Sequence, residues 1–451
     1  MDGSILKDPS NVGLSTTVHG WVKSVRLHKQ IAFVEVADGS VSKGIQVVIE
    51  TPELAQDLST GCSIKIVGKV VKSMGKKQDV EIHAESVDCI GAANPKEYPL
   101  QKKRHSLEYL REIGHLRLRS NIIGSVLRLR DFAERGFSRF FADNEFLRVH
   151  TPILTSNDCE GGGETFNATT EKATLEEAEN SFFGRKVNLT VSGQLHAEVA
   201  ASAFPRVYTF GPVFRAEPSL TGRHLAEFWM LEAECAFITS LSQLMDVIEE
   251  SIKSTTRYIQ DMADADLALF SKWVYPELEK RLSSITTQKA YPRITYTEAI
   301  EILQKATPRE PFEFAPKWGS GLQSEHEKYL SSEHFESPVF VTDYPIEVKP
   351  FYMLANPDGR TVACMDLLVP GPCELAGGSL REHSHDKLLA RITDLGMEAE
   401  SLDWYLDLRK FGTTPHGGFG IGFDRYIQML TGLESIRDII PFPRYYGRCQ
   451  Y

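Results

Sequence analysis

Residues 16 to 90 alternate short apolar runs with polar turns. The apolar runs lie near 17–25, 31–37, 45–50, 62–71 and 79–90, and Gly, Ser, Asp or Lys residues separate them. Runs of this length and spacing predict five β-strands. Five strands in so short a segment suit a small barrel of the oligonucleotide-binding type.

From residue 121 onward apolar residues recur at the longer spacing that is typical of helices. Apolar residues at 122, 126, 129, 133, 137 and 140 recur at the spacing of a buried helical stripe. Further helical patterns cover 241–262, 265–280 and 297–305, and strand-like runs lie before and after them. Because no βαβ unit repeats, we expect an antiparallel sheet flanked by helices, which makes the whole chain α+β.

These patterns predict a division of the 451 residues. Residues 1–95 hold the barrel, 96–120 form a basic hinge that contains proline, and 121–451 form the larger domain. A helical insertion is expected at about 240–335, and its sequence shows no chemistry of its own. A chain of this length is too long for a single core, which agrees with two or more domains.

Two arginines stand at the edges of apolar runs. Arg215 follows a predicted strand at 207–214, and a polar turn at 216–223 leads to the return strand at 225–231. Arg425 lies in the first turn of a predicted helix at 423–429, after a strand with glycines at 418, 420 and 422. Glycines let a strand pass close to a ligand, and a helix start favours bound phosphate. The pattern therefore indicates a triphosphate site.

The sequence around these arginines resembles that of a known protein family. Phe-Arg-Ala-Glu (214–217) with Arg-His-Leu-Ala-Glu-Phe (223–228) resembles motif 2 of the class II aminoacyl-tRNA synthetases, and 417–425 resembles motif 3. The subclass is that of the aspartate, asparagine and lysine enzymes. Residues 223–232 and 436–444 are similar to its asparagine-specific members. Residues 98–103 and 315–319 are similar to bacterial and organellar forms, especially mitochondrial ones. The helix after residue 120 with the strand at 146–154 resembles motif 1, which implies a homodimer.

The resemblance implies roles in amino-acid activation by ATP. Activation places negative charge on the α-phosphate, so catalysis is chiefly positioning and stabilisation by cations. The catalytic pair implied is Arg215, at the α-phosphate and substrate carboxylate, and Arg425, at the γ-phosphate. The remaining ATP contacts implied are Phe228 on adenine, with Arg223, His224 and Glu217.

Two acidic residues match the family's metal pair. Asp366 and Glu374 adjoin apolar runs, and Mg²⁺ takes hard oxygen ligands from one or two carboxylates with phosphate and water. From the residues alone, each would be a half-buried acid with its own partners. The chain departs from the family at Pro372-Cys373, where a glycine usually precedes the glutamate.

The amino-acid pocket is inferred from the resemblance. Ser192 and Gln194 match contacts to the substrate α-amino group, Glu160 lies in a glycine-rich loop that closes over it, and Arg381 matches the arginine that faces the substrate side chain. Aspartate enzymes add a lysine three residues after that glutamine, where this chain has Ala197. The pocket therefore has one cation fewer than in aspartate enzymes, and Glu217 is able to accept from an amide NH₂. Both features favour asparagine over aspartate as the substrate.

The barrel carries the implied anticodon contacts. Phe33 and Gln46 match the family's base-stacking and base-reading positions, and Glu81 and Arg26 are further candidates. Stacking on aromatic side chains and reading of base edges are how such barrels bind single strands. From the residues alone, Phe33 would be a core residue and Gln46 a surface residue.

Composition narrows the partners and the compartment. The net charge of −11 argues against a broad basic surface, so a tRNA must use local patches. Residues 101–105 with Arg111, Arg117 and Arg119 form one such patch, or equally a solvated helix face. Seven scattered cysteines without a CxxC pair predict reduced thiols, and neither a membrane span nor a signal peptide is visible. We expect the mitochondrial matrix or the cytoplasm, and no secretion.

Four functions remain open on the sequence. The leading one is an asparagine–tRNA ligase that uses L-asparagine, ATP with Mg²⁺, and tRNA(Asn). The nearest alternative is an aspartyl-tRNA synthetase, including a non-discriminating one. An asparagine-forming amide ligase would not need the barrel, and a regulatory paralogue would not need Arg215, Arg425, Asp366 and Glu374.

Overall fold

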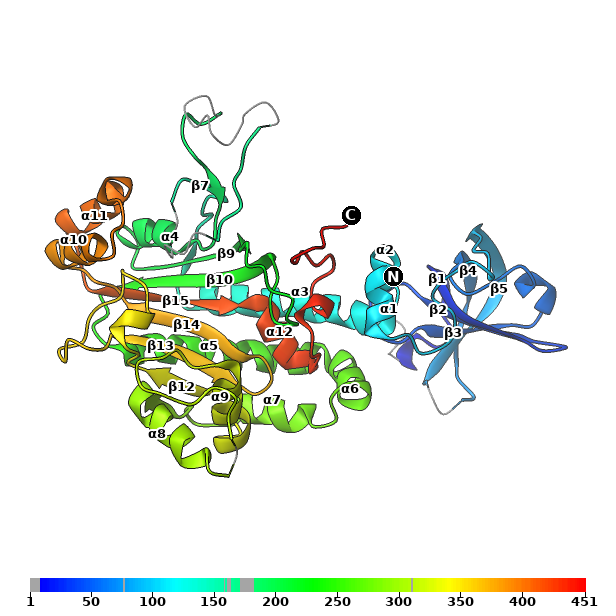
Figure 1. The fold of residues 1–451 in the computed structure, drawn as a ribbon. Helices are drawn as coiled ribbons and strands as arrows, with labels where there is room; N and C mark the ends of the chain where they lie inside the picture. The colour runs from blue at the N-terminus through cyan, green and yellow to red at the C-terminus, as the bar shows by residue number, and fades with distance from the viewer. Residues whose placement is uncertain (1–8, 76–77, 158, 160–163, 171–181, 310) are drawn as a thin grey trace. The chain divides into compact units, whose positions relative to one another are not determined.

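The chain divides into two compact units (Figure 1). The computed structural model describes residues 9–75, 78–157, 159, 164–170, 182–309 and 311–451. Residues 1–129, 263–269 and 451 belong to the first unit, and residues 130–262 and 270–450 belong to the second. Each unit has its own hydrophobic core, so each is described by itself.

The first unit contains a closed five-stranded barrel. Its strand order is β1-β2-β3-β5-β4, with β3 and β5 parallel and the other pairs antiparallel. The strands are β1 (Ser15–Leu27), β2 (Ala32–Ala37), β3 (Ile45–Ile49), β4 (Ser63–Lys72) and β5 (Val80–Gly91). Every strand end lies within two residues of its expected apolar run, so the predicted barrel is confirmed.

Alternation along β2 decides which side chains leave the barrel. Ala32, Val34 and Val36 point inward and are buried, because successive side chains of a strand face opposite sides. Phe33 is consequently on the outer face and half-buried. The interpretation of Phe33 as a core residue, which its apolar run alone favours, is therefore wrong.

Short helices follow the barrel in the first unit. They are α1 (Leu107–Glu112) and α2 (Gly114–Arg117), and α3 (Asn121–Asp143) continues from them. The Ser106 hydroxyl accepts a hydrogen bond of 3.2 Å from the Tyr109 backbone N–H and so caps α1. Leu100, Leu110 and Ile123 pack together beneath these helices.

The second unit is built on an eight-stranded sheet. Its order is β11-β12-β13-β14-β15-β10-β9-β6, antiparallel except for the outer pairs β11–β12 and β9–β6. The strands are β6 (Leu147–Arg148), β9 (Arg206–Phe214), β10 (Glu227–Ala236), β11 (Arg293–Thr295), β12 (Val339–Thr342), β13 (Cys364–Val369), β14 (Cys373–Leu380) and β15 (His416–Gly422). A separate pair joins β7 (Leu154–Thr155) to β8 (Asn188–Leu189). The predicted antiparallel sheet is confirmed.

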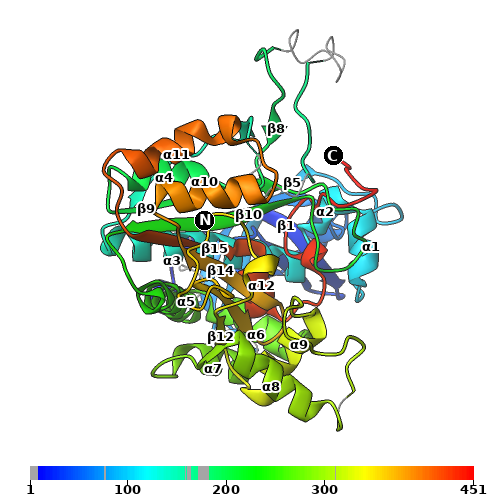
Figure 2. The ribbon, with the colours of Figure 1, turned by 60° about the vertical axis from the view of Figure 1, so that its left-hand side comes forward.

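Helices cover both faces of this sheet. In Figures 1 and 2, α4 (Gln194–Ala201), α10 (His385–Asp394) and α11 (Asp403–Lys410) lie together near β9 and β10. A side chain at Gly418 of β15 would meet Glu234 at 2.1 Å, whereas one at Gly417 would meet Leu244 of α5 (Leu241–Met262) at 2.9 Å. Neighbouring residues of a strand face opposite sides, so α5 lies on the face opposite to Glu234.

One predicted helix is broken in two. The expected helix at 265–280 is α6 (Asp264–Trp273) followed by α7 (Leu278–Thr286). Pro276 lies between them, and proline lacks the N–H that a continuous helix needs. The other helices are α8 (Tyr296–Ala306), α9 (Ser324–Lys328) and α12 (Phe423–Thr431), and a π-helical turn follows at Tyr329–His334.

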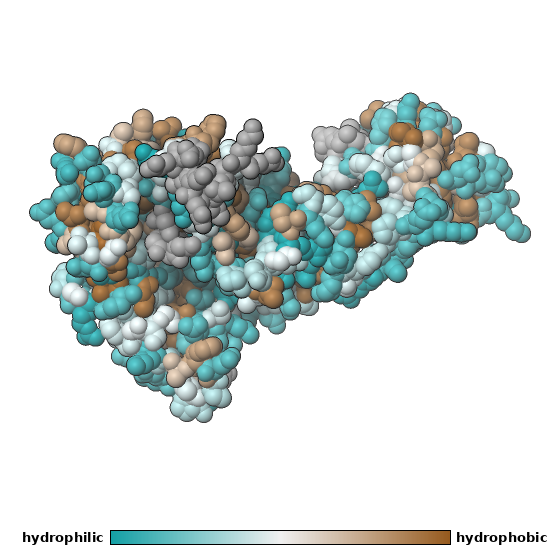
Figure 3. All heavy atoms as spheres, turned by 45° about the horizontal axis from the view of Figure 1, so that its top comes forward, coloured by the Kyte–Doolittle hydropathy of each residue, from teal (hydrophilic) through white to brown (hydrophobic). Residues whose placement is uncertain are grey.

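The surface mixes hydrophilic and hydrophobic residues. On the face drawn in Figure 3, hydrophilic side chains surround small hydrophobic groups. Within the part of the chain that the structure describes, no helix is both long and apolar enough to cross a membrane.

Candidate active site

A cavity of about 520 Å³ opens on the sheet face that carries Glu234. Strands β10, β13, β14 and β15 form its floor, the turn after β9 contributes from one side, and α4 and α12 contribute from their first turns. The cavity is lined by eleven of the residues predicted to act on ATP, metal or amino acid: Ser192, Gln194, Arg215, Glu217, Arg223, His224, Phe228, Asp366, Glu374, Arg381 and Arg425. Residues far apart in the sequence thus meet at one site.

Arg215 is positioned by the hairpin of β9 and β10. Its backbone N–H donates to Ala226 O at 3.0 Å, which continues the ladder in which Phe214 pairs with Glu227. The guanidinium carbon of Arg215 lies 5.5 Å from the Phe228 ring centroid. A cation over an aromatic face is held in place without losing its ability to bind an anion.

Arg425 is presented by the first turn of α12. Its Nη1 donates to Glu374 O at 2.8 Å and lies 3.4 Å from Glu374 Oε2. The neighbouring Asp424 is buried; it accepts from the Trp229 backbone N–H at 2.9 Å and pairs with Arg130. The hydrogen bond fixes the start of α12 against β10, and the ion pair ties it to α3.

The polar turn carries a second group of charges. His224 Nε2 lies 3.3 Å from Glu217 Oε2, and its Nδ1 lies 2.6 Å from Thr221 Oγ1. Arg223 Nη2 donates to Pro372 O at 2.9 Å. The turn is therefore tied to the start of β14, beside Glu374.

The two predicted metal ligands face one space. A Cβ atom at Gly377 would lie 3.2 Å from Asp366 Oδ1 and 3.5 Å from Glu374 Oε1. Only glycine leaves this space open between the carboxylates. Among the residues described, no group of three or more acidic, histidine or cysteine side chains is placed to hold a metal. Two carboxylates completed by phosphate and water are a donor set that suits Mg²⁺, so these residues fit the expected ion.

Cations balance this acidic pair. Burial raises the pKa of Asp366, and Lys349, whose Nζ lies 2.7 Å away, opposes that shift. Burial also acts against ionised Glu374, but Arg425, Lys349 and Arg215 together hold its pKa below its ordinary value. Lys349, which the sequence analysis missed, therefore belongs to the site.

The departure at Cys373 has a structural consequence. Cys373 directly precedes Glu374 and has φ of 69°, in the left-handed region that favours glycine. The backbone at Cys373 therefore has a conformation that glycine adopts more readily than cysteine. Its side chain is buried, with Sγ 3.6 Å from Ser324 O.

The predicted insertion does carry a group at the site, contrary to expectation. Glu327 of α9 lies 3.5 Å from Arg223 Nη2. Burial raises the pKa of Glu327 to about 7, and the nearby Glu374 adds to the shift. No hydrophobic period distinguishes this residue in the sequence, because α9 is a single polar turn of helix.

The other end of the cavity is built for a small polar ligand. The Ser192 hydroxyl donates to Glu232, which also accepts from the Gly193 backbone N–H at 2.8 Å. Arg381 Nη2 and Nε lie 2.5 and 3.3 Å from the two carboxylate oxygens of Glu234. The sequence analysis missed Glu232 and Glu234, although two glutamates two residues apart in an apolar strand were a signal that both face one polar site.

Ala197 does not line this cavity. It is fully buried and packs with Ala201 and Val207 in a small apolar cluster. A lysine there would have to leave this cluster to reach Arg381. At this end of the cavity Arg381 is instead accompanied by the negatively charged Glu234.

The glycine-rich loop is described only at its ends. Glu160, predicted to contact the amino acid, lies outside the described residues. Glu164 O accepts from the Ala216 backbone N–H at 2.9 Å, which ties the end of the loop to the turn between Arg215 and Glu217.

The predicted anticodon residues form one patch on the barrel. Arg26 Nη2 donates to Gln46 Oε1 at 3.2 Å, and Gln46 Nε2 donates to Glu81 Oε2 at 2.9 Å. The Arg26 guanidinium lies 5.6 Å from the Phe33 ring centroid. His83, 3.6 Å from Glu81, adjoins the patch and was not predicted. An aromatic face beside a polar network can stack a base and bond its edge.

Comparison with known proteins agrees with this architecture. Residues 106–446 match the family described as "tRNA synthetases class II (D, K and N)", and residues 16–90 match the "OB-fold nucleic acid binding domain". The chain therefore belongs to the class II aminoacyl-tRNA synthetases, which are ligases.

Similar proteins of known name define the branch. The asparagine–tRNA ligase of Desulfotalea psychrophila is 49% identical over 434 residues, covering 95% of this chain and 94% of that protein. Human asparaginyl-tRNA synthetase is 46% identical, covering 96% and 90%. The crystal structure of the Pyrococcus horikoshii asparaginyl-tRNA synthetase complexed with asparaginyl-adenylate has a TM-score of 0.87 and 29% identity, covering 98% of each chain. Within its class, the chain belongs to the asparagine–tRNA ligases.

Proposed function

We propose that the cavity activates L-asparagine with ATP and transfers it to tRNA(Asn), with the residues above in defined roles. The observation that carries this proposal is the Arg381–Glu234 pair at one end of the cavity, with Arg215 and Arg425 at the other. The pair can meet a carboxamide with both a donor and an acceptor. A carboxylate would gain from Arg381 but be repelled by Glu234.

Adenylate formation needs positioning and neutralisation of charge. The substrate carboxylate oxygen forms a bond to the α-phosphorus, and the bond to pyrophosphate breaks. Arg215 stabilises the charge that develops on the α-phosphate, and Arg425 and Arg223 hold the leaving pyrophosphate. Phe228 stacks on adenine, while Glu217 and His224 fix the turn that carries these contacts.

Asp366 and Glu374 are proposed to hold Mg²⁺. When bound, the ion would neutralise phosphate charge. Lys349 balances Asp366, which keeps this half-buried carboxylate compatible with folding.

The α-amino group is proposed to contact Ser192 and Gln194, with Glu160 closing over it. The aminoacyl group then passes to a terminal ribose hydroxyl of the tRNA, forming the ester as AMP leaves. The patch of Arg26, Phe33, Gln46 and Glu81 would read the anticodon, because its aromatic and polar groups lie side by side.

ATP–pyrophosphate exchange with asparagine and with aspartate, followed by charging of tRNA(Asn), tests this function. We expect exchange and charging with asparagine, and at least 10³-fold lower kcat/KM with aspartate. Exchange with aspartate alone, or no exchange with either amino acid, would overturn the proposal.

We also propose a homodimer through the segment that resembles motif 1. Leu147, Ile153 and Leu154 expose 43–45% of their surface there, which favours a covering partner. Light scattering should give twice the chain mass, and Leu147→Asp with Leu154→Asp should give the monomer.

The compartment is proposed to be the mitochondrial matrix or the cytoplasm. All seven cysteines are free thiols, as expected in a reducing compartment. Fractionation of cells that express the tagged protein would distinguish the two, and recovery from the medium would exclude both.

A further inference from the structure

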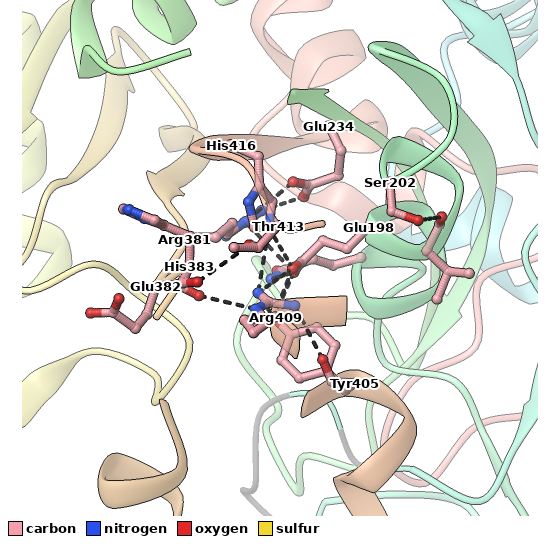
Figure 4. A network of polar contacts seen from close by, with 12 residues as sticks. Glu198, Ser202, Glu234, Arg381, Glu382, His383, Tyr405, Arg409, Thr413 and His416 are labelled. Atoms are coloured by element: carbon pink, nitrogen blue, oxygen red, sulfur yellow. Dashed lines mark hydrogen bonds and ion pairs between the residues drawn. The ribbon is translucent and has the colours of Figure 1, made fainter. Parts of the chain in front are cut away.

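A buried polar network lies behind the substrate end of the cavity, centred on Glu198 of α4 (Figure 4). The Glu198 side chain has no exposed surface and does not line the cavity. It nevertheless contacts two residues that do, Gln194 and Arg381. No sequence motif predicts a role for Glu198, and the proposed mechanism does not use this residue.

The two oxygens of Glu198 face different partners. Oε1 accepts from Gln194 Nε2 at 3.1 Å and lies 3.8 Å from Arg381 Nε. Oε2 accepts from Arg409 Nη2 at 2.7 Å and lies 3.1 Å from His416 Nε2. The Tyr405 hydroxyl donates to both oxygens, at 2.9 and 2.8 Å. One oxygen therefore serves the pocket, and the other anchors the carboxylate to α11 and β15.

The contact with Gln194 orients its amide. Because Nε2 donates to Glu198, the amide oxygen is the acceptor that Gln194, a residue of the cavity lining, can offer to a ligand. An oxygen acceptor is what a substrate ammonium group requires. Without a charged acceptor at Glu198, the amide could rotate and present its NH₂ to the ammonium instead.

The contact with Arg381 sets the local charge. Arg381 and Arg409 are both buried, and the two carboxylates beside them are Glu198 and Glu234. Burial raises the pKa of Glu198, but Arg409, His416 and Arg381 outweigh it and hold the pKa well below its ordinary value. Glu198 therefore remains ionised and removes part of the charge with which Arg381 would attract a carboxylate.

We infer that Glu198 is a positioning residue that sets asparagine specificity from behind the pocket, by orienting Gln194 and compensating the charge of Arg381. This inference rests on the proposed function of the cavity. Its consequence is that neutralising Glu198 impairs binding of the α-amino group and makes the pocket more tolerant of aspartate.

The test is Glu198→Gln, which keeps the shape of the side chain and removes its charge. Exchange kinetics should show KM for asparagine raised about 10-fold, KM for ATP within twofold of the original value, and an asparagine-to-aspartate kcat/KM ratio at least 10-fold lower. The matched control is Glu249→Gln on α5, a buried glutamate paired with Lys253 outside the cavity. The control should leave both KM values and the ratio unchanged.

Two outcomes would refute the inference. One is an unchanged ratio and asparagine KM in folded Glu198→Gln, and the other is the same loss in the Glu249→Gln control. If Glu198→Gln does not fold, Glu198→Asp keeps the charge and shortens the side chain away from Gln194 Nε2, and an unchanged asparagine KM there would also refute it. Failure of the unmodified protein to use asparagine would instead refute the proposed function.

Discussion

Replacing Glu234 by glutamine should convert the pocket towards aspartate. The Glu234 side chain is 2% exposed, and its oxygens lie 2.5 and 3.3 Å from Arg381. Glutamine keeps the size of the side chain and an oxygen acceptor, but it removes the negative charge. A substrate carboxylate would then meet Arg381 without a competing anion.

The magnitude follows from the geometry. A substrate group bound to Arg381 lies about 5 Å from Glu234, because both contact one guanidinium. Two like charges at that distance repel by about 3 kcal/mol at an effective dielectric constant of about 20. Removing this repulsion corresponds to a factor of about 10² in relative kcat/KM for aspartate.

Pyrophosphate exchange with each amino acid at pH 8 measures the effect. The control is Glu234→Asp, which keeps the charge and should retain most of the discrimination. If Glu234→Gln remained folded and its preference for asparagine changed by less than threefold, the charge of Glu234 would not control specificity.

Four further predictions follow from the site. Burial and the nearby Glu198 raise the pKa of Glu234 to about 7, against the opposing effect of Arg381. Protonation of Glu234 as the pH falls removes its repulsion of a substrate carboxylate, so kcat/KM for aspartate should rise from pH 8 to pH 6. The Glu234→Gln variant should lack this rise. Arg215→Ala should slow pyrophosphate exchange about 10² to 10³-fold and leave tRNA binding intact in a filter assay. Phe33→Ala should weaken tRNA binding by about 1 to 3 kcal/mol with unchanged exchange; an equal fall in exchange would show unfolding instead. Cys373→Gly should change the free energy of unfolding by less than about 1 kcal/mol, because relief of the strain in the left-handed backbone at this residue offsets the lost packing. As a control, Cys364→Gly in β13 should lower the free energy of unfolding by about 2 kcal/mol or more.

Local patterns were sufficient for most elements of the fold. The barrel strands and the hairpin around Arg215 follow from short apolar runs between turns, because strand burial depends on residues close together in sequence. The pattern failed at 265–280, where the hydrophobic spacing of a helix continues across Pro276 but the helix itself is interrupted.

The residues proposed to bind the nucleotide were also predicted from the sequence. The sequence motifs are specific enough to predict the ligands of four residues that the cavity brings together: Arg215, Arg425, Asp366 and Glu374. The motifs could not show how the charges are balanced. Lys349 and Glu327 lie in segments that contain no recognisable motif. A charged residue can balance another charge from any segment that folding places nearby, so no motif is required.

The amino-acid sequence by itself determined the class, the two-part architecture and eleven of the residues that line the cavity, since these depend on local period and on motifs. Tertiary structure alone decided that Phe33 faces outward, that Ala197 belongs to an apolar cluster, and that Glu234 and Glu198 compensate Arg381. Specificity between a carboxamide and a carboxylate depends on the summed charge within a few ångströms. That sum is set by residues of α4, β10 and α11 and by Arg381, which directly follows β14, and only folding brings these together.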